Sequence, residues 1–151
     1  MKKILPLILD SNFNMIGTID TYKSLIWTTR YYVHGDFEIT VGLTPQVMSL
    51  IRIGNYVTRD DDENVGIIEK IDLKITETNE QQLIISGRFL TQILGRRIIA
   101  EQTQVSDTVS AAIYQLITDA IINPAIEDRK INNFILGSFE TSDTIEAQYT
   151  G

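Results

Sequence analysis

Alternation of apolar and polar residues dominates the first hundred positions and predicts strands. The segment "DFEITV", residues 36–41, alternates strictly, so its three apolar side chains share one face of a strand. β-Branched and aromatic runs bounded by turn-forming residues predict further strands over residues 1–9, 14–22, 24–33, 64–76 and 82–89. The last two of these strands are joined by a short polar segment, which is typical of a hairpin.

A short helix is predicted between the strands. Thr44 can cap its N-terminus, Pro45 suits its first position, and "QVMSLI" supplies one or two turns before Gly54. The β-rich region is therefore expected to carry one short flanking helix.

The hydrophobic period changes near residue 100. Along "SDTVSAAIYQLITDAIINP", residues 106–124, apolar residues recur at steps of three and one, which is typical of a helix that faces a core. Ser106 or Asp107 would cap this helix, and Pro124 would end it, because proline disfavours helical geometry in the preceding residue. "KINNFILGSFE", residues 130–140, then returns to a strand-like pattern.

This change of period predicts two domains. Residues 1–100 are expected to form an antiparallel β-barrel or sandwich with the flanking helix. Residues 101–151 are expected to begin a second domain of helix plus strand, which the sequence leaves truncated. The predicted fold class is therefore α+β and rich in β-structure.

The charge balance bears on possible partners. Twenty acidic residues against thirteen basic ones give a formal net charge of -7, and basic residues gather only in short pairs such as Lys2–Lys3. Specific nucleic-acid binding normally needs a basic face, so we expect none. DNA can still pass near an acidic surface, because repulsion prevents it from sticking.

Other composition features exclude several classes of site. The chain has no cysteine, which excludes disulfides, thiolate metal sites and cysteine nucleophiles. No apolar run approaches the roughly 20 residues that span a bilayer, so we expect no membrane partner.

The densest acidic cluster, "RDDDENVG", partly matches a calcium-binding loop. Asp60, Asp62 and Asn64 occupy the first three ligand positions. The match then fails, because Val65 replaces the glycine at position six and Ile71 replaces the glutamate at position twelve. A solvated hairpin turn is the favoured interpretation, and no metal is predicted.

Two groups of residues could suggest a hydrolase. His34 is the only histidine, but no serine lies in a recognisable nucleophile elbow, which favours a histidine in a turn. Asp61 and Glu69 could imitate a glycosidase carboxylate pair, yet nothing in the sequence indicates a cleft around them. The sequence therefore predicts no catalytic residue and no cofactor.

The segment "ISGRFLTQILGRRII", residues 85–99, lacks the lysine and hydroxyl residue of a phosphate-binding loop. It predicts a strand that ends at Phe89, a helical turn and a chain reversal at Gly95. The guanidinium groups of Arg96 and Arg97 would then bond to carboxylates of the same or a neighbouring chain. The segment is interpreted as a structural corner.

Several segments, taken in order, resemble the N-terminal part of the tail hub proteins of siphophages and their prophages, a family that includes tail-associated lysins and minor tail proteins. They are "YKSLIWTTRYYVHGDFEITV", "NVGIIEKIDL", "LIISGRFLTQILGRRII", "DRKINNFILG" and "QYTG". The most specific elements are the aromatic strand before Phe37, "GIIEKI" and the arginine pair.

The resemblance implies a structural role. Such a protein would form a trimeric baseplate hub at the tail tip, with barrel domains related to the tail tube fold around the DNA exit channel. Its partners would be the tail tube, distal tail and tape measure proteins, and it would assemble in the bacterial cytoplasm. Arg88, Arg96, Arg97 and Trp27 are the residues expected at structural or inter-subunit contacts.

Members of that family continue beyond this length, into a second barrel and often a C-terminal extension that can carry a cell-wall-degrading domain. The resemblance therefore predicts that this chain is a fragment and not itself an enzyme. One alternative is a small binding module for a host-surface glycan or a tail partner protein, with Trp27, Tyr31 and Tyr32 as its aromatic platform. A hydrolase is the less favoured alternative.

Overall fold

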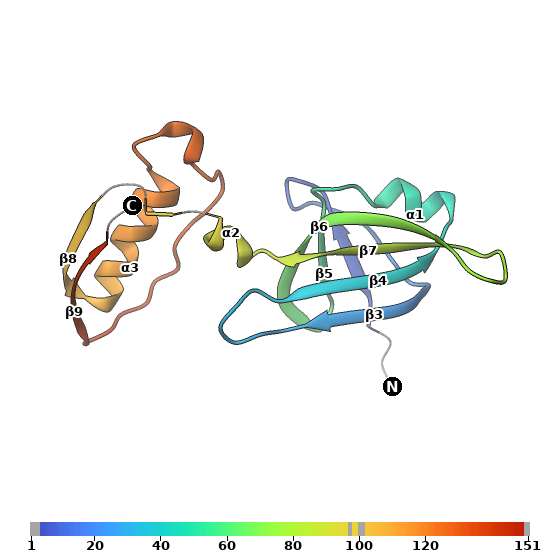
Figure 1. The fold of residues 1–151 in the computed structure, drawn as a ribbon, viewed down its shortest axis with the longest axis horizontal. Helices are drawn as coiled ribbons and strands as arrows, with labels where there is room; N and C mark the ends of the chain where they lie inside the picture. Colours follow the sequence, from blue (N-terminus) through green and yellow to red (C-terminus); the bar gives the residue numbers. More distant parts are fainter. Residues whose placement is uncertain (1–3, 97, 100–101, 150–151) are drawn as a thin grey trace. The chain divides into compact units, whose positions relative to one another are not determined.

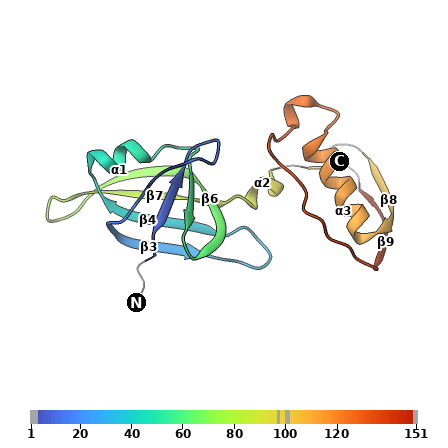
Figure 2. The same cartoon turned by 180° about the vertical axis from the view of Figure 1, so that it is seen from behind.

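The computed structural model describes residues 4–96, 98–99 and 102–149. The chain divides into two compact units, Met1–Ile93 and Leu94–Gly151, and each is described by itself (Figures 1 and 2).

The first unit is built on one seven-stranded antiparallel sheet with the order β2-β1-β5-β6-β7-β4-β3. Its strands are β1 (Pro6–Leu9), β2 (Met15–Thr18), β3 (Tyr22–Thr28), β4 (Asp36–Gly42), β5 (Tyr56–Arg59), β6 (Asp62–Ile75) and β7 (Gln81–Phe89). With the helices of the chain, this sheet confirms the β-rich α+β class.

The sheet is open, so the barrel, one of the two predicted forms of this domain, is wrong. Among the described residues, β2 and β3 are its two edge strands. Closure would require these strands to exchange backbone hydrogen bonds along their lengths. Within the described residues, β2 and β3 lie at opposite ends of the strand order and do not pair. In the link between them, the Ile19 amide donates to the carbonyl oxygen of Pro6 over 2.9 Å, which continues the β1–β2 pairing. The Ile19 side chain is buried, which holds this corner of the sheet against the core.

One apolar core lies against the inner face of the sheet. Its alternation is clearest in β4, where Phe37, Ile39 and Val41 are buried and the residues between them are half-exposed, as the sequence predicts. The buried core residues of the first unit are Ile8, Ile19, Phe37, Ile39, Val41, Val47, Ile51, Val57, Ile68, Leu83, Ile85 and Phe89.

The predicted short helix is confirmed as α1 (Pro45–Leu50). The Thr44 hydroxyl accepts a hydrogen bond from the backbone N–H of Val47 at 3.2 Å, which satisfies one of the donors left over at a helix N-terminus. Val47 and Ile51 then bury their side chains in the core. The helical turn expected after Phe89 is also present, as α2 (Gln92–Gly95).

Three features of the first unit differ from the sequence prediction. The strand predicted over residues 14–22 ends at Thr18 as β2, and Tyr22 already belongs to β3. Strand β5 was not predicted, because it has four residues and only Val57 is buried, too few to establish a period. Strand β3 ends at Thr28, so residues 29–35 form the turn to β4 instead of continuing the strand.

The second unit contains a helix and a two-stranded sheet. Helix α3 (Val109–Ile117) continues into a π-helical turn, η1 (Thr118–Ile122), just before Asn123, where the sequence predicts the end. Strands β8 (Thr103–Thr108) and β9 (Thr144–Tyr149) pair antiparallel, and η2 (Glu127–Arg129) is a short 3₁₀ turn.

Two predictions for this unit are wrong: the residue that caps helix α3 and the strand over residues 130–140. The N-cap is Thr108, whose hydroxyl accepts from Ala111 N, whereas Ser106 and Asp107 lie in β8. Residues 130–140 form no strand.

Residues 130–140 are tied to the helix by a backbone bond and by the side chain of Tyr114. Ile131 N donates to Ile121 O of η1 at 3.0 Å. The Tyr114 hydroxyl donates to Gly137 O at 2.6 Å and accepts from Phe139 N at 3.0 Å. The Tyr114 and Phe139 rings also stack, with centroids 5.1 Å apart.

Candidate functional site

Arg88 lies on the face of β7 opposite the core, since its neighbour Phe89 is buried inside. Its guanidinium donates two hydrogen bonds to the Glu69 carboxylate, from Nε at 2.7 Å and from Nη2 at 2.8 Å. These bonds raise the pKa of Arg88. The β6–β7 register shifts between Ile68 and Lys70, at Glu69, and this bulge is where the pair forms.

The ion pair belongs to a longer row of charges on the outer face of the sheet. Asp36 on β4 lies directly opposite Arg88 in the antiparallel register. Asp36 also forms an ion pair with Arg30, which lies in the turn that precedes β4. Arg30, Asp36, Arg88 and Glu69 thus alternate in sign, and we call them the outer charge row. Both arginine–carboxylate ion pairs of the row are made within the first unit.

Trp27 lies on β3 and packs inside the first unit. Its ring centroid is 5.7 Å from that of Phe37 and 4.7 Å from that of Phe89. The Arg59 guanidinium carbon lies 5.4 Å from the Trp27 ring centroid, within cation–π range. The indole N–H is buried and has no hydrogen-bond partner in the described part of the chain. Trp27 therefore contributes to side-chain packing within the first unit.

Tyr31 and Tyr32 lie in the turn between β3 and β4, with exposed fractions of 91% and 93%. Their rings contact edge to face at 4.7 Å. The base of the turn is fixed, because Phe89 N donates to Gly35 O at 2.9 Å and Arg30 Nη1 donates to His34 O at 3.3 Å. The structure therefore separates these two tyrosines from Trp27.

The arginine pair follows α2. Arg96 is exposed in the turn after that helix. Arg97 lies outside the described residues.

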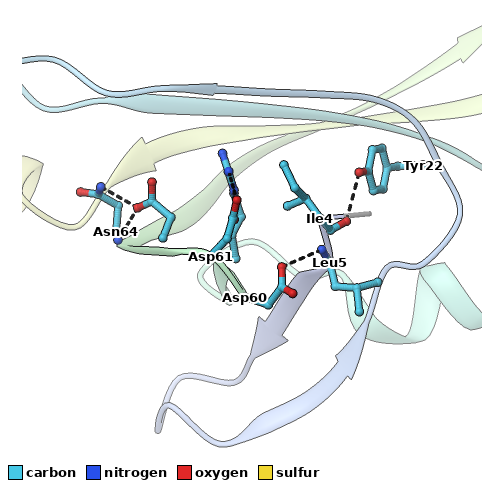
Figure 3. Close-up of polar contacts among 8 residues, drawn as sticks. Ile4, Leu5, Tyr22, Asp60, Asp61 and Asn64 are labelled. Carbon is cyan, nitrogen blue, oxygen red and sulfur yellow. Dashed lines mark hydrogen bonds and ion pairs between the residues drawn. The ribbon is translucent and has the colours of Figure 1, made fainter. Parts of the chain in front are cut away.

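In the acidic turn between β5 and β6, each of the three aspartates bonds to a different residue (Figure 3). One Asp60 oxygen accepts from Leu5 N at 3.1 Å. One Asp62 oxygen accepts from both the backbone and the side-chain amide of Asn64, each at 2.7 Å. Burial opposes ionisation of Asp62, but the bonds from Asn64 hold its pKa below the usual value. Within the described ranges, no group of three or more acidic or histidine side chains could hold a metal ion.

The two carboxylates considered as a glycosidase pair have different arginine partners. Asp61 accepts bonds from Arg59 Nε and Nη2, each at 2.8 Å, and Glu69 is held by Arg88. The bond from Arg59 lowers the pKa of Asp61. A glycosidase acid needs a raised pKa, so Asp61 does not suit that role.

The sequence reasoning missed the partnership of Arg88 with Glu69. Both residues lie in the predicted hairpin, and opposite charges on facing strands were the available signal. The bulge at Glu69 sets which residues meet, and no simple alternation predicts it.

The second unit contains a cavity of about 230 Å³ beside the π-helical turn. Leu116, Pro124 and Ile126 contribute apolar lining, and Asp119 and Arg129 contribute charge. Arg129 Nη2 donates to Ile98 O at 2.6 Å, so its guanidinium also fixes the nearby chain.

Among the helices that the structure describes, none is long and apolar enough to cross a membrane.

The chain matches the model of a known protein family. The family described as Siphovirus ReqiPepy6 Gp37-like protein matches residues 5–144. No curated protein matches the chain. The family match spans the sheet of the first unit and most of the second unit.

Proposed function

Because the chain belongs to the Siphovirus ReqiPepy6 Gp37-like family of phage proteins, we propose that it is a structural component of a phage or prophage tail tip. In this proposal it forms part of the baseplate hub around the DNA exit channel. The match over residues 5–144 carries the proposal, and the antiparallel sheet supports it as a wall element related to the tail tube fold.

The charge of the chain supports a position beside moving DNA. A channel that releases a genome should not bind phosphates, and a net charge of -7 disfavours such binding. The arginines of the outer charge row are paired with carboxylates, which lowers their attraction for phosphate. The proposal assigns no catalytic role to these residues.

The proposed partners are further copies of the same chain, as a homotrimer, and the tail tube, distal tail and tape measure proteins. The proposed location is the virion tail tip, after assembly in the bacterial cytoplasm. Arg96 and Arg97 are proposed to contribute to subunit contacts.

Labelling of tail particles tests the proposed location. An antibody against this segment, applied to phage particles and viewed by electron microscopy, should bind at the distal end of the tail. Label on the capsid, or particles that lack the protein, would count against the proposal.

Alanine substitution tests the subunit contact. Arg96→Ala with Arg97→Ala should reduce the fraction of the protein that is recovered as oligomer. Arg52→Ala is the matched control, since Arg52 is exposed on the first unit. Equal oligomer recovery in the two variants would refute a role for the arginine pair.

The second candidate function is a binding module, favoured by one observation. Tyr31 and Tyr32 present two almost fully exposed rings on a fixed turn, and exposed tyrosines are frequent in binding surfaces. A glycan array should show binding that Tyr31→Ser with Tyr32→Ser removes and Ile53→Ser retains. An array without hits would leave only a protein partner for these tyrosines.

A further inference from the structure

Strand β6 extends beyond β5, the strand that pairs with one of its two edges. Its register with β5 ends at the Tyr56–Ile67 pair, whereas its register with β7 continues to Ile75. Figures 1 and 2 show the β6–β7 hairpin projecting past the end of the sheet. Leu73 and Ile75 are 58% and 59% exposed there. Residues 70–75 of β6 thus have a single neighbouring strand within the described chain.

The backbone groups of this open edge can be assigned. Thr76 N donates to Glu80 O, so the even-numbered residues of this part of β6 bond toward β7. The N–H and C=O groups of the odd-numbered residues, Ile71, Leu73 and Ile75, therefore point to the opposite side. Upstream on that side, Ile68 exchanges hydrogen bonds with Asn55 O and Gly54 N, so the covered part of the edge ends at Ile68.

We propose that this open edge of β6 pairs antiparallel with the same edge of a second copy of the chain, about a two-fold axis at Leu73. In this register Leu73 lies opposite Leu73 of the second copy, and Ile71 lies opposite its Ile75. The apolar side chains that are exposed on the free hairpin then cover one another. The odd-numbered backbone groups gain partners, as in other strand-addition interfaces.

Charge complementarity selects this register. Asp72 already forms an ion pair with Lys70 of its own chain at 2.6 Å, and both side chains are exposed. In this register Asp72 of each copy also faces Lys74 of the other, which gives two opposite-charge pairs across the axis. An axis at Asp72 would place aspartate opposite aspartate, and an axis at Lys74 would place lysine opposite lysine. An axis at Ile71 would need the edge near Ile68, which the chain already covers.

This inference goes beyond the proposed tail role and does not depend on it. A two-fold contact cannot close a ring of three copies, so it joins free copies or two separate assemblies. A single short strand edge buries little surface, so the self-association is expected to be weak.

Cysteine cross-linking tests the axis directly, because the chain contains no cysteine. Opposed residues in a hydrogen-bonded antiparallel pair have Cα atoms about 5.5 Å apart, within the range that a disulfide bridges. Leu73→Cys should therefore form a covalent dimer readily under mild oxidation. In the same register the Cα atoms of residue 74 in the two copies lie roughly 8 Å apart, beyond the range that a disulfide bridges, so Lys74→Cys should cross-link poorly.

Ile53→Cys serves as the collision control, because Ile53 is 69% exposed on the same unit. Cross-linking of Leu73→Cys above both controls supports the proposal. Equal cross-linking of the three variants would overturn it. Circular dichroism of each variant confirms that the unit remains folded.

A charge-swap series tests the register by sedimentation. Lys74→Asp places two aspartates opposite each other in each pair and should weaken self-association about tenfold, and Asp72→Lys should do the same with lysines. The double variant, Asp72→Lys with Lys74→Asp, restores opposite charges and should recover the original association. A double variant no better than either single variant would show that this register is wrong.

Discussion

Gly87 should be the least replaceable glycine of the sheet. It lies in β7, opposite Phe37 of β4 and Ile68 of β6, at the bulge. A Cβ atom added at this position would lie 1.8 Å from Ile67 O, 2.9 Å from Ile67 C and 3.1 Å from Glu69 N. These are backbone atoms, so no change of rotamer can relieve the overlap. Gly87→Ala must therefore move β6 away from β7.

The size of the effect follows from the bonds that this movement strains. Two backbone hydrogen bonds at about 1 kcal/mol each, plus about 1–3 kcal/mol of overpacking, oppose a gain of about 0.5–1 kcal/mol from the lost flexibility of glycine. The free energy of unfolding should therefore fall by about 2–4.5 kcal/mol. Gly42→Ala is the matched control, because a Cβ at Gly42 in β4 meets no atom within 4 Å.

Urea denaturation measures the difference. Trp27 is the only tryptophan and packs against Phe37 and Phe89, so its fluorescence reports the first unit. Gly42→Ala should leave the midpoint unchanged or raise it. A Gly87→Ala midpoint equal to that of Gly42→Ala would refute the steric reasoning.

Three further effects are expected. Thr44→Ala should lower the free energy of unfolding, measured by urea denaturation, by about 1 kcal/mol. Thr44→Ser should lower it much less, because the serine hydroxyl can still cap α1. A double-mutant cycle of Arg88→Ala and Glu69→Ala should give a coupling of about 0.5 kcal/mol, since solvent screens this partly exposed pair. A backbone hydrogen bond from Asn14 lowers the pKa of Asp10 in the folded chain. The Asp10 carboxylate therefore stabilises the fold above its unfolded pKa, near 4, and this stabilisation is lost as the pH falls through the lower folded pKa. Thermal melts in acid should show a weaker pH dependence for Asp10→Asn than for the unmodified chain.

Strong local patterns made part of the fold predictable. The alternation around Ile39 gives β4, and Thr44 with Pro45 gives the start of α1. The unpredicted β5 has one buried residue, Val57, and its place in the sheet depends on distant β1 and neighbouring β6. The openness of the sheet is likewise a matter of which strands lie at its edges, β2 and β3 among the described residues, and no local period encodes that order.

The candidate site was less predictable for a related reason. Trp27 and Tyr31 are close in sequence and chemically alike, yet β3 ends between them. That end leaves Trp27 half-buried against the core and Tyr31 in solvent. The partner of Arg88 depends on the bulge at Glu69, which shifts the register by one residue. Residue type suggested arginine–carboxylate pairing, but only the register identifies the carboxylate.

The strand order also bears on how the first unit folds. The β6–β7 and β3–β4 hairpins pair segments that are neighbours in sequence, so they require little loop closure. In contrast, β1 must find β5 across the intervening strands and helix, joining Leu9 to Tyr56. We therefore expect the two hairpins to form early and β1, together with β2, to dock late. Destabilising changes in β1 should then accelerate unfolding while leaving the refolding rate nearly unchanged.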